Sequence, residues 1–183
     1  MSEKNTVIRS LHDIGLAAWF GGSLMGAVGL NGAAAEAADP RERLKISSDG
    51  WARWAPVSAA AIGAHLVGGV GLIGANRTRL ASQPGAKSNT AVKTVLTGAA
   101  MALTAYSGYL GTQTKKHEDE GAAGSTEPRP GASEELRTAQ QHLKVTQWAI
   151  PAVTGALLVL SAQQGEQQRP QTLLRQQLGR LGS

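Results

Sequence analysis

The sequence has no cysteine and few aromatic residues. Its 183 residues include one Phe, two Tyr and four Trp, so aromatics make up only 4% of the chain. Without cysteine the chain has no disulfide, no thiolate nucleophile and no thiolate ligand for zinc or an iron–sulfur cluster. A water-soluble core is hard to fill with so few rings, whereas membrane helices pack through small side chains. The 23 glycines therefore favour a membrane protein.

The net charge of +5 does not indicate a nucleic-acid partner. Nucleic-acid-binding proteins gather their basic residues on one face or along one stripe. Here the basic residues are spread through every hydrophilic segment and are mixed with acids in two of them. We therefore predict that the chain binds no nucleic acid.

Four apolar segments have about the length that crosses a hydrocarbon core of ~30 Å. They cover residues 14–30, 54–75, 91–112 and 145–162. Each is apolar or small nearly all round, whereas the helices of a soluble bundle carry an apolar stripe on one side. The sequence therefore predicts an all-α integral membrane four-helix bundle with short loops. Residues 1–165 form this membrane domain, and residues 166–183 form a tail.

The first segment has a second interpretation, as a signal peptide. Basic residues precede it, and the small-residue stretch GAAAEAA follows it, as at a cleavage site. Glu3 and Asp13 weaken the positive charge that a signal peptide needs. We therefore interpret the segment as a first membrane span; cleavage would leave three spans.

The positions of Lys and Arg predict the orientation of the spans. Arg77, Arg79 and Lys87 lie close to span ends with no acid beside them, while the long third loop carries the acidic run HEDE. Basic residues in short loops stay on the cytoplasmic side. We predict a multi-pass protein of the bacterial inner membrane with cytoplasmic N- and C-termini, and the bilayer itself as a partner.

The third loop and the C-terminal tail are polar segments outside the predicted spans. GAAGSTEPRPGA, residues 121–132, is typical of a flexible linker, and the helix-forming residues after it extend the fourth span outward. In the tail, Leu174, Leu178 and Leu181 follow helical spacing with Arg175 and Arg180 beside them. This pattern fits an amphipathic helix on an anionic leaflet, or else a frayed tail rich in Gln.

Two helical patterns predict how the spans pack. Small residues recur every four positions in the first and second spans, at Ala18, Gly22, Gly26, Ala60, Ala64 and Gly68. Such residues let two backbones approach closely. The third span carries a polar stripe of Thr94, Thr97 and Thr104. Its hydroxyls bond either to helix carbonyls and neighbouring helices or along a polar pathway.

His65 is the one ionisable side chain well inside a predicted span. An intramembrane histidine is a candidate functional residue, here for cofactor binding, and the alternative is a structural hydrogen bond across the bundle. A haem held by two histidines requires a partner at the same depth. The predicted topology places His12 near the inner surface and His142 near the outer surface, about 10 Å or more from the depth of His65. We predict no cofactor and no metal.

His12, Gly15, Trp19, Gly21 and Gly22 form a pattern in which a histidine precedes a Trp-x-Gly-Gly turn. This pattern resembles the opening helix of small bacterial membrane proteins of the copper-resistance D-like and related uncharacterised groups. The resemblance implies a multi-span inner-membrane protein, and for some members a role with metal. This chain departs from copper handling because it has no cysteine and only three methionines.

The sequence contains no nucleotide loop, nucleophile–base pair, zinc motif or paired catalytic carboxylates. It therefore predicts a protein that is not an enzyme. The first hypothesis is a membrane accessory or scaffold subunit that packs with itself or with a larger membrane protein. The alternative is a small transporter or cofactor-binding redox subunit that uses His65.

Overall fold

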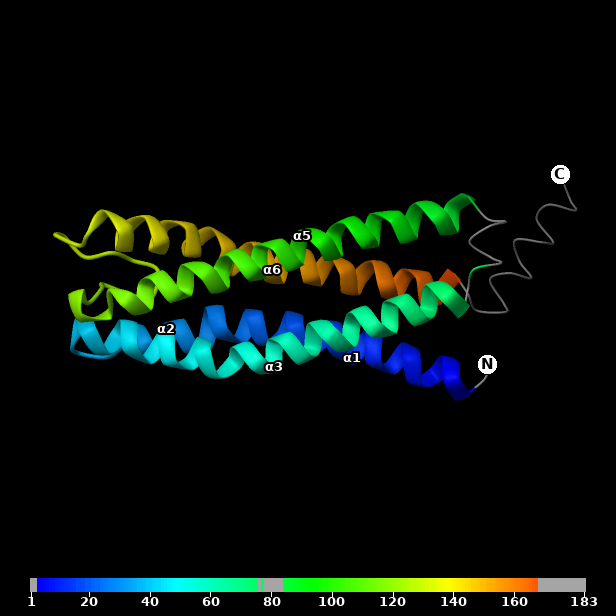
Figure 1. Ribbon diagram of the computed structural model, residues 1–183, viewed down its shortest axis with the longest axis horizontal. Helices are drawn as coiled ribbons and strands as arrows, with labels where there is room; N and C mark the ends of the chain where they lie inside the picture. The colour runs from blue at the N-terminus through cyan, green and yellow to red at the C-terminus, as the bar shows by residue number, and fades with distance from the viewer. Residues whose placement is uncertain (1–2, 76, 78–83, 168–183) are drawn as a thin grey trace, which may run out of the picture.

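A computed structural model describes residues 3–75, 77 and 84–167, and these form helices without any strand. Figure 1 shows the helices lying side by side along one long axis. They are α1 (Glu3–Met25), the π-helical turn η1 (Gly26–Leu30), α2 (Asn31–Ala35), α3 (Pro40–Ala75), α5 (Pro84–Lys116), the 3-10 turn η2 (Glu118–Glu120) and α6 (Glu134–Gln167). The predicted all-α class is confirmed. The predicted tail lies, apart from its first two residues, outside the described residues.

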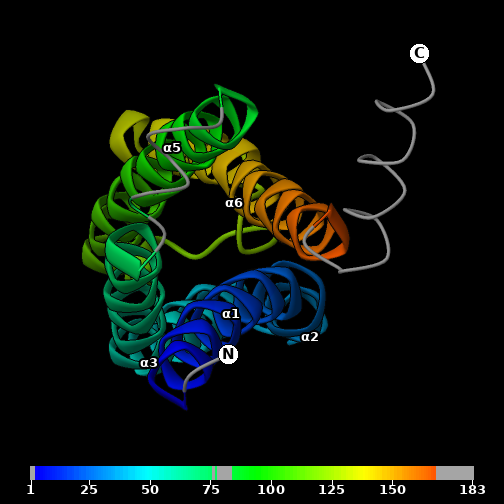
Figure 2. The same ribbon diagram turned by 90° about the vertical axis from the view of Figure 1, so that its right-hand side faces the viewer.

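The long helices form two antiparallel hairpins. α1 packs along α3 and α5 packs along α6, while α1 also contacts α6 and a smaller contact joins α3 to α5. Figure 2 shows the four long helices arranged around a common axis. Since successive helices run in opposite directions, the start of α1 and the end of α6 lie at the same end of the bundle (Figure 1).

Three helices are long and apolar enough to cross a membrane. They cover Thr6–Ala35, Pro40–Ala75 and Glu134–Gln163. α5 is also long, but Lys93 and several Thr, Ser, Tyr and Gly residues lower its apolarity. Three of the four predicted spans therefore lie in helices that are apolar enough to cross a membrane. The remaining one, at residues 91–112, lies in α5, which is less apolar over its span.

The helices extend well beyond the predicted segments. α3 has 36 residues, which at 1.5 Å per residue span about 54 Å, against ~30 Å for a hydrocarbon core. The prediction followed apolarity and so began this helix at residue 54, whereas the helix begins at Pro40. Proline suits the first helical turn because its missing N–H would have no partner there. Polar turns therefore continue the helices past the apolar segments.

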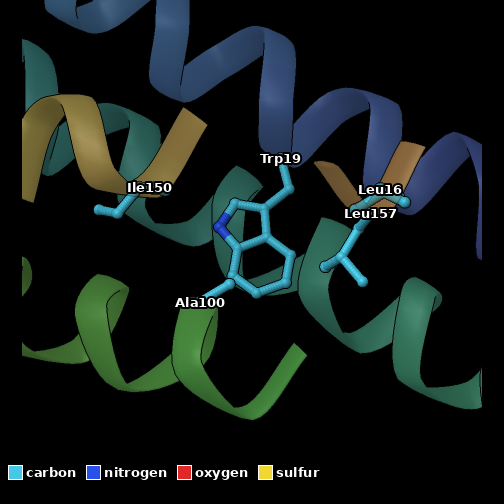
Figure 3. Close-up of a cluster of buried hydrophobic side chains, with 5 residues drawn as sticks. All are labelled: Leu16, Trp19, Ala100, Ile150 and Leu157. Carbon is cyan, nitrogen blue, oxygen red and sulfur yellow. The ribbon is translucent and has the colours of Figure 1, made fainter. Parts of the chain in front are cut away.

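The core is small and lies near the middle of the bundle. Figure 3 shows the Trp19 indole reaching from α1 toward Ala100 on α5. The buried members of this cluster are Leu16, Trp19, Ala100, Ile150 and Leu157. Many large apolar side chains point outward instead, including Val70 and Val95, which are both 71% exposed. A surface so apolar needs a covering of lipid or protein.

The segment after η2 is an ordered loop, and the prediction of a flexible linker at residues 121–132 is wrong. The backbone N–H of Ala122 donates to the carbonyl of Pro40 at 3.0 Å, and an Arg43 guanidinium N–H donates to the carbonyl of Ala123 at 2.8 Å. Ala122 and Ala132 pack with Leu44 and Leu136 in a second apolar cluster. The small residues that resembled a linker are the ones that fit between the two hairpins.

Ser133 begins α6 as its N-cap. Its hydroxyl accepts a hydrogen bond from the Leu136 N–H at 3.3 Å, and its own N–H donates to the Glu120 carboxylate at 2.8 Å. A serine in this position satisfies one of the unpaired N–H groups at a helix start. The loop and the helix start are thus tied together.

Candidate functional site

His65 is buried in α3, with 4% of its surface exposed. Its Nδ1 lies 3.1 Å from the carbonyl oxygen of His12 on α1. Because a carbonyl only accepts, this geometry puts the hydrogen on Nδ1 of the His65 ring. Nε2 of the same ring is 3.5 Å from the Thr97 hydroxyl on α5. His65 therefore bridges three helices.

The two histidine rings touch each other. The ring centroids of His12 and His65 are 4.2 Å apart, with an interplanar angle of 39°. The predicted separation in depth, which argued against a shared ligand, is therefore wrong for this pair. The prediction counted depth from residue 14, but α1 begins at Glu3, so His12 lies within the helix and at the level of His65. His142 does lie apart, on α6, where it pairs with the Tyr106 hydroxyl at 2.6 Å.

Charged groups surround the histidine pair on two sides. His12 Nδ1 lies 2.9 Å from the Asp13 carboxylate, whose side chain is 53% exposed. Lys93 on α5 is partly buried and interacts electrostatically with Asp13 and Arg9. We call these six residues the histidine cluster: Arg9, His12, Asp13, His65, Lys93 and Thr97. Sequence reasoning named His65 and Thr97 but did not connect them with His12 or Lys93, because their contact depends on how the helices are paired.

The three threonines of the predicted stripe have different surroundings. Thr94 is exposed and donates to its own helix at the Thr90 carbonyl, 2.9 Å away. Thr97 faces His65. Thr104 accepts from the Trp19 indole N–H at 3.1 Å and donates to the Ala100 carbonyl at 2.8 Å. Two of the three therefore lie between helices, and Thr94 does not.

The small residues of α1 and α3 meet large neighbours as well as backbone. A Cβ added at Gly68 would lie 2.7 Å from the His12 Cα. Gly22 and Gly26 face the rings of Trp54 and Trp51, so these glycines make room for indoles on α3. Ala18 and Ala64 are half-buried.

Two positions in this interface differ from the predicted pattern. Ala60 is exposed, and the residue after it, Ala61, is the one that faces α1. Gly15 was not among the predicted packing residues, yet a Cβ there would lie 2.5 Å from the Ala61 carbonyl oxygen. Its spacing of seven residues before Gly22 is a helical signal that could have identified it.

A second polar network joins the helices near the loop end of the bundle. The Asn31 side chain accepts from the Trp51 indole at 2.9 Å and donates to the Gln147 amide oxygen at 2.9 Å. The Gln147 amide then donates to the Thr126 hydroxyl at 3.3 Å. Asn31 and Gln147 could have served as a signal for this network, since they are polar residues at the margins of the predicted apolar segments, where lipid would offer them no partner.

The acidic turn η2 has its own ion pair. His117 Nδ1 lies 2.7 Å from the Glu120 carboxylate. Hydrogen bonds from the backbone N–H and the hydroxyl of Ser133 hold the pKa of Glu120 below its ordinary value, and His117 lowers it further. The turn therefore acts as an anchor for the loop.

A shallow groove of about 250 Å³ lies between α1 and α3. Its lining is almost wholly apolar and consists of Thr6, Val7, Ser10, Leu11, Ile14 and Ala64. Within residues 3–75, 77 and 84–167, no three His, Asp or Glu side chains come close enough to hold a metal ion. The histidine cluster brings titratable side chains of α1, α3 and α5 together.

The chain matches no family model, no curated protein and no solved structure. The resemblance of residues 12–22 to copper-resistance D-like proteins therefore stays a prediction.

Proposed function

We propose that the chain is an integral membrane protein of the bacterial inner membrane that acts as an accessory or scaffold subunit. In this proposal it packs with itself or with a larger membrane protein, and His65 serves to hold helices together. The observation that carries the proposal is the internal pairing of the polar groups between the helices.

The interhelical polar groups use one another. His65 is bonded to His12 and faces Thr97, and Trp19 is bonded to Thr104. Among the described residues, four buried side-chain atoms lack a partner, and none of them belongs to these bonds. They are Asn89 Oδ1, Glu118 Oε2, Gln140 Oε1 and Ser161 Oγ. Paired groups of this kind stabilise a helix bundle in lipid, whereas a substrate site usually presents unpaired groups to a cavity.

The outer surface supports a membrane location. The side chains of Val57, Val67 and Val159 are 48%, 64% and 57% exposed. Residues 145–163 of α6 contain no charged side chain. Among the described long helices, α5 is the one without a stretch apolar enough to cross a membrane, and its Gly98 and Gly108 have open space beside them. This helix is the face where contact with a protein partner, instead of lipid, fits best.

If all four long helices cross the membrane, the start of α1 and the end of α6 lie on one side of it, and in this proposal that side is the cytoplasm. The start of α1 and the end of α6 lie at one end of the bundle (Figure 1). A cysteine placed at either terminus of the cysteine-free chain is expected to react with a membrane-impermeant maleimide only after the cells are opened. Reaction of only one terminus in intact cells would contradict this orientation.

The test of the scaffold proposal is gentle purification from native membranes followed by mass determination of the intact assembly. A stoichiometric partner or a defined homo-oligomer is expected. Replacing His65 by Gln should leave the assembly intact because glutamine can still donate to the His12 carbonyl. Replacing Gly68 by Ile should abolish it. An isolated monomer in every mild detergent would contradict the proposal.

The contact of the two histidine rings favours a second candidate, a small transporter or redox subunit that uses His65. Two imidazoles 4.2 Å apart, with the exposed Asp13 carboxylate beside them, could pass protons between water and the bundle interior. In that case His65→Gln should remove activity while leaving assembly unchanged. An absorption spectrum and metal analysis of the purified protein separate a redox subunit from both other functions.

A further inference from the structure

The histidine cluster combines close contact of two titratable rings with an unbalanced set of charges. α1 contributes Arg9 and Asp13, and α5 contributes Lys93, which interacts with both. On α6, residues 145–163 contain no titratable side chain. The cluster therefore carries two cations and one carboxylate, and of these Lys93 and Asp13 interact electrostatically with His65.

The hydrogen bonds of His65 assign a role to each of its ring nitrogens while α1, α3 and α5 are in contact. His65 donates from Nδ1 to the His12 carbonyl, so its Nε2 is an acceptor when the ring is neutral. The Thr97 hydroxyl, 3.5 Å away, is then the donor to that nitrogen. A proton on Nε2 of His65 would face this donor and would require the hydroxyl to turn.

We propose that the His12–His65 pair is a proton-binding site that takes up one proton, and that this uptake loosens α5 from the α1–α3 hairpin. The loosening occurs at the histidine end of the bundle, the end at which α1 begins. The proton moves from water, beside the exposed Asp13, to a ring nitrogen of the pair. A second proton is opposed by the first, because two imidazolium rings in contact repel each other strongly where water is scarce.

The position of α5 explains why this helix moves. Among the neighbouring pairs of long helices in the bundle, α3 and α5 share the smallest contact. Thr97 on α5 faces His65 on α3 across it. An added positive charge on the pair repels Lys93, which α5 carries on the same side. At the loop end a separate ion pair, between Lys115 and Asp49 at 3.1 Å, holds the same two helices. The seam should therefore open at the histidine end and stay closed at the loop end.

The absence of native cysteine makes a direct distance measurement possible. Val67 on α3 and Val95 on α5 are 64% and 71% exposed and flank the histidine cluster. Spin labels on V67C and V95C, in the full chain in nanodiscs, are expected to report longer distances at about pH 5 than at about pH 8, across the range in which histidine titrates. Labels on A52C and T112C, at the loop end of the same seam, should report no change.

Two variants decide whether the pair causes the shift. With His65→Gln, which does not titrate, the V67C–V95C distance should be the same at both pH values, while His142→Gln should leave the shift intact. A distance that does not depend on pH, or a shift that persists in His65→Gln, would overturn the proposal.

Discussion

The two helical hairpins both contain glycines, but the glycines compared below have different surroundings. In the α1–α3 hairpin, Gly15 and Gly68 lie against backbone of the opposite helix. In the α5–α6 hairpin, Gly98, Gly108 and Gly111 have nothing within 4 Å of an added Cβ. The first hairpin is packed through its backbones, and the second is joined by side chains, such as the Tyr106 hydroxyl and His142. The glycine count of a span therefore does not tell how it packs.

The largest expected effect comes from filling the α1–α3 contact. Gly68→Ile forces a branched side chain into the His12 backbone and should lower the free energy of unfolding by on the order of 3 kcal/mol or more. Gly108→Ile on α5 is the matched control, and it should change stability little because the position is open. Thermal unfolding in detergent measures both. Equal losses in the two variants would remove the distinction between the hairpins.

The next effect tests the polar network that crosses between the hairpins. Asn31→Ala removes the partner of both the Trp51 indole N–H and the Gln147 amide oxygen, and should cost about 1 kcal/mol or more because partly buried groups are left unpaired. Chemical denaturation of the variant measures the loss. Asn31→Asp keeps the acceptor for Trp51 and loses the donor to Gln147, so it should fall between the wild type and Asn31→Ala. An unchanged midpoint in Asn31→Ala would show that the network does not join the hairpins.

A smaller effect is expected at the bond between the Trp19 indole and the Thr104 hydroxyl. Trp19 belongs to the central core (Figure 3). Trp19→Phe and Thr104→Val each remove one partner, and the double variant should lose less than the sum of the two. The coupling should be about 1 kcal/mol, as for a typical hydrogen bond between side chains. Strict additivity in the double-mutant cycle would mean that the bond contributes nothing.

The smallest effect concerns the loop anchor at η2, the ion pair of His117 and Glu120. Because the pKa of Glu120 is held below its ordinary value of 4.5, its carboxylate stabilises the loop above that pH and loses this effect as the pH falls further. Glu120→Gln should therefore increase exchange of the Ser133 amide hydrogen at neutral pH and remove its dependence on acid. Hydrogen exchange followed by mass spectrometry reports it, and identical protection in both proteins would contradict this role.

The sequence predicted the helical class and most of the apolar segments because both depend on local composition. Periodicity also located Gly22, Gly26 and Gly68 in the α1–α3 hairpin. It misplaced the contact by one residue at Ala60, because a helix turns by 100° per residue and the face it presents depends on its partner. Small shifts in rotation of this kind are set by tertiary packing.

The histidine cluster and the loop were harder to predict, for a common reason. His12 meets His65 only because α1 starts early and runs antiparallel to α3, which no spacing within one helix records. The loop at residues 121–132 has the composition of a linker, and its order depends on partners such as Pro40 and Gln140 that lie far away in the sequence. Contacts between distant segments decide both features.

The most direct test of the central claim, that these helices stand in a membrane with an ordered polar end outside it, is cysteine accessibility in intact membranes. Single cysteines at the exposed positions Val67, Val95 and Val159 should resist a membrane-impermeant maleimide, while cysteines at Glu135 and Lys116 react once their side of the membrane is reached. Protection at all three valines, Val95 of the less apolar α5 included, is the predicted result. Equal labelling of the valines and the polar positions would contradict a membrane bundle.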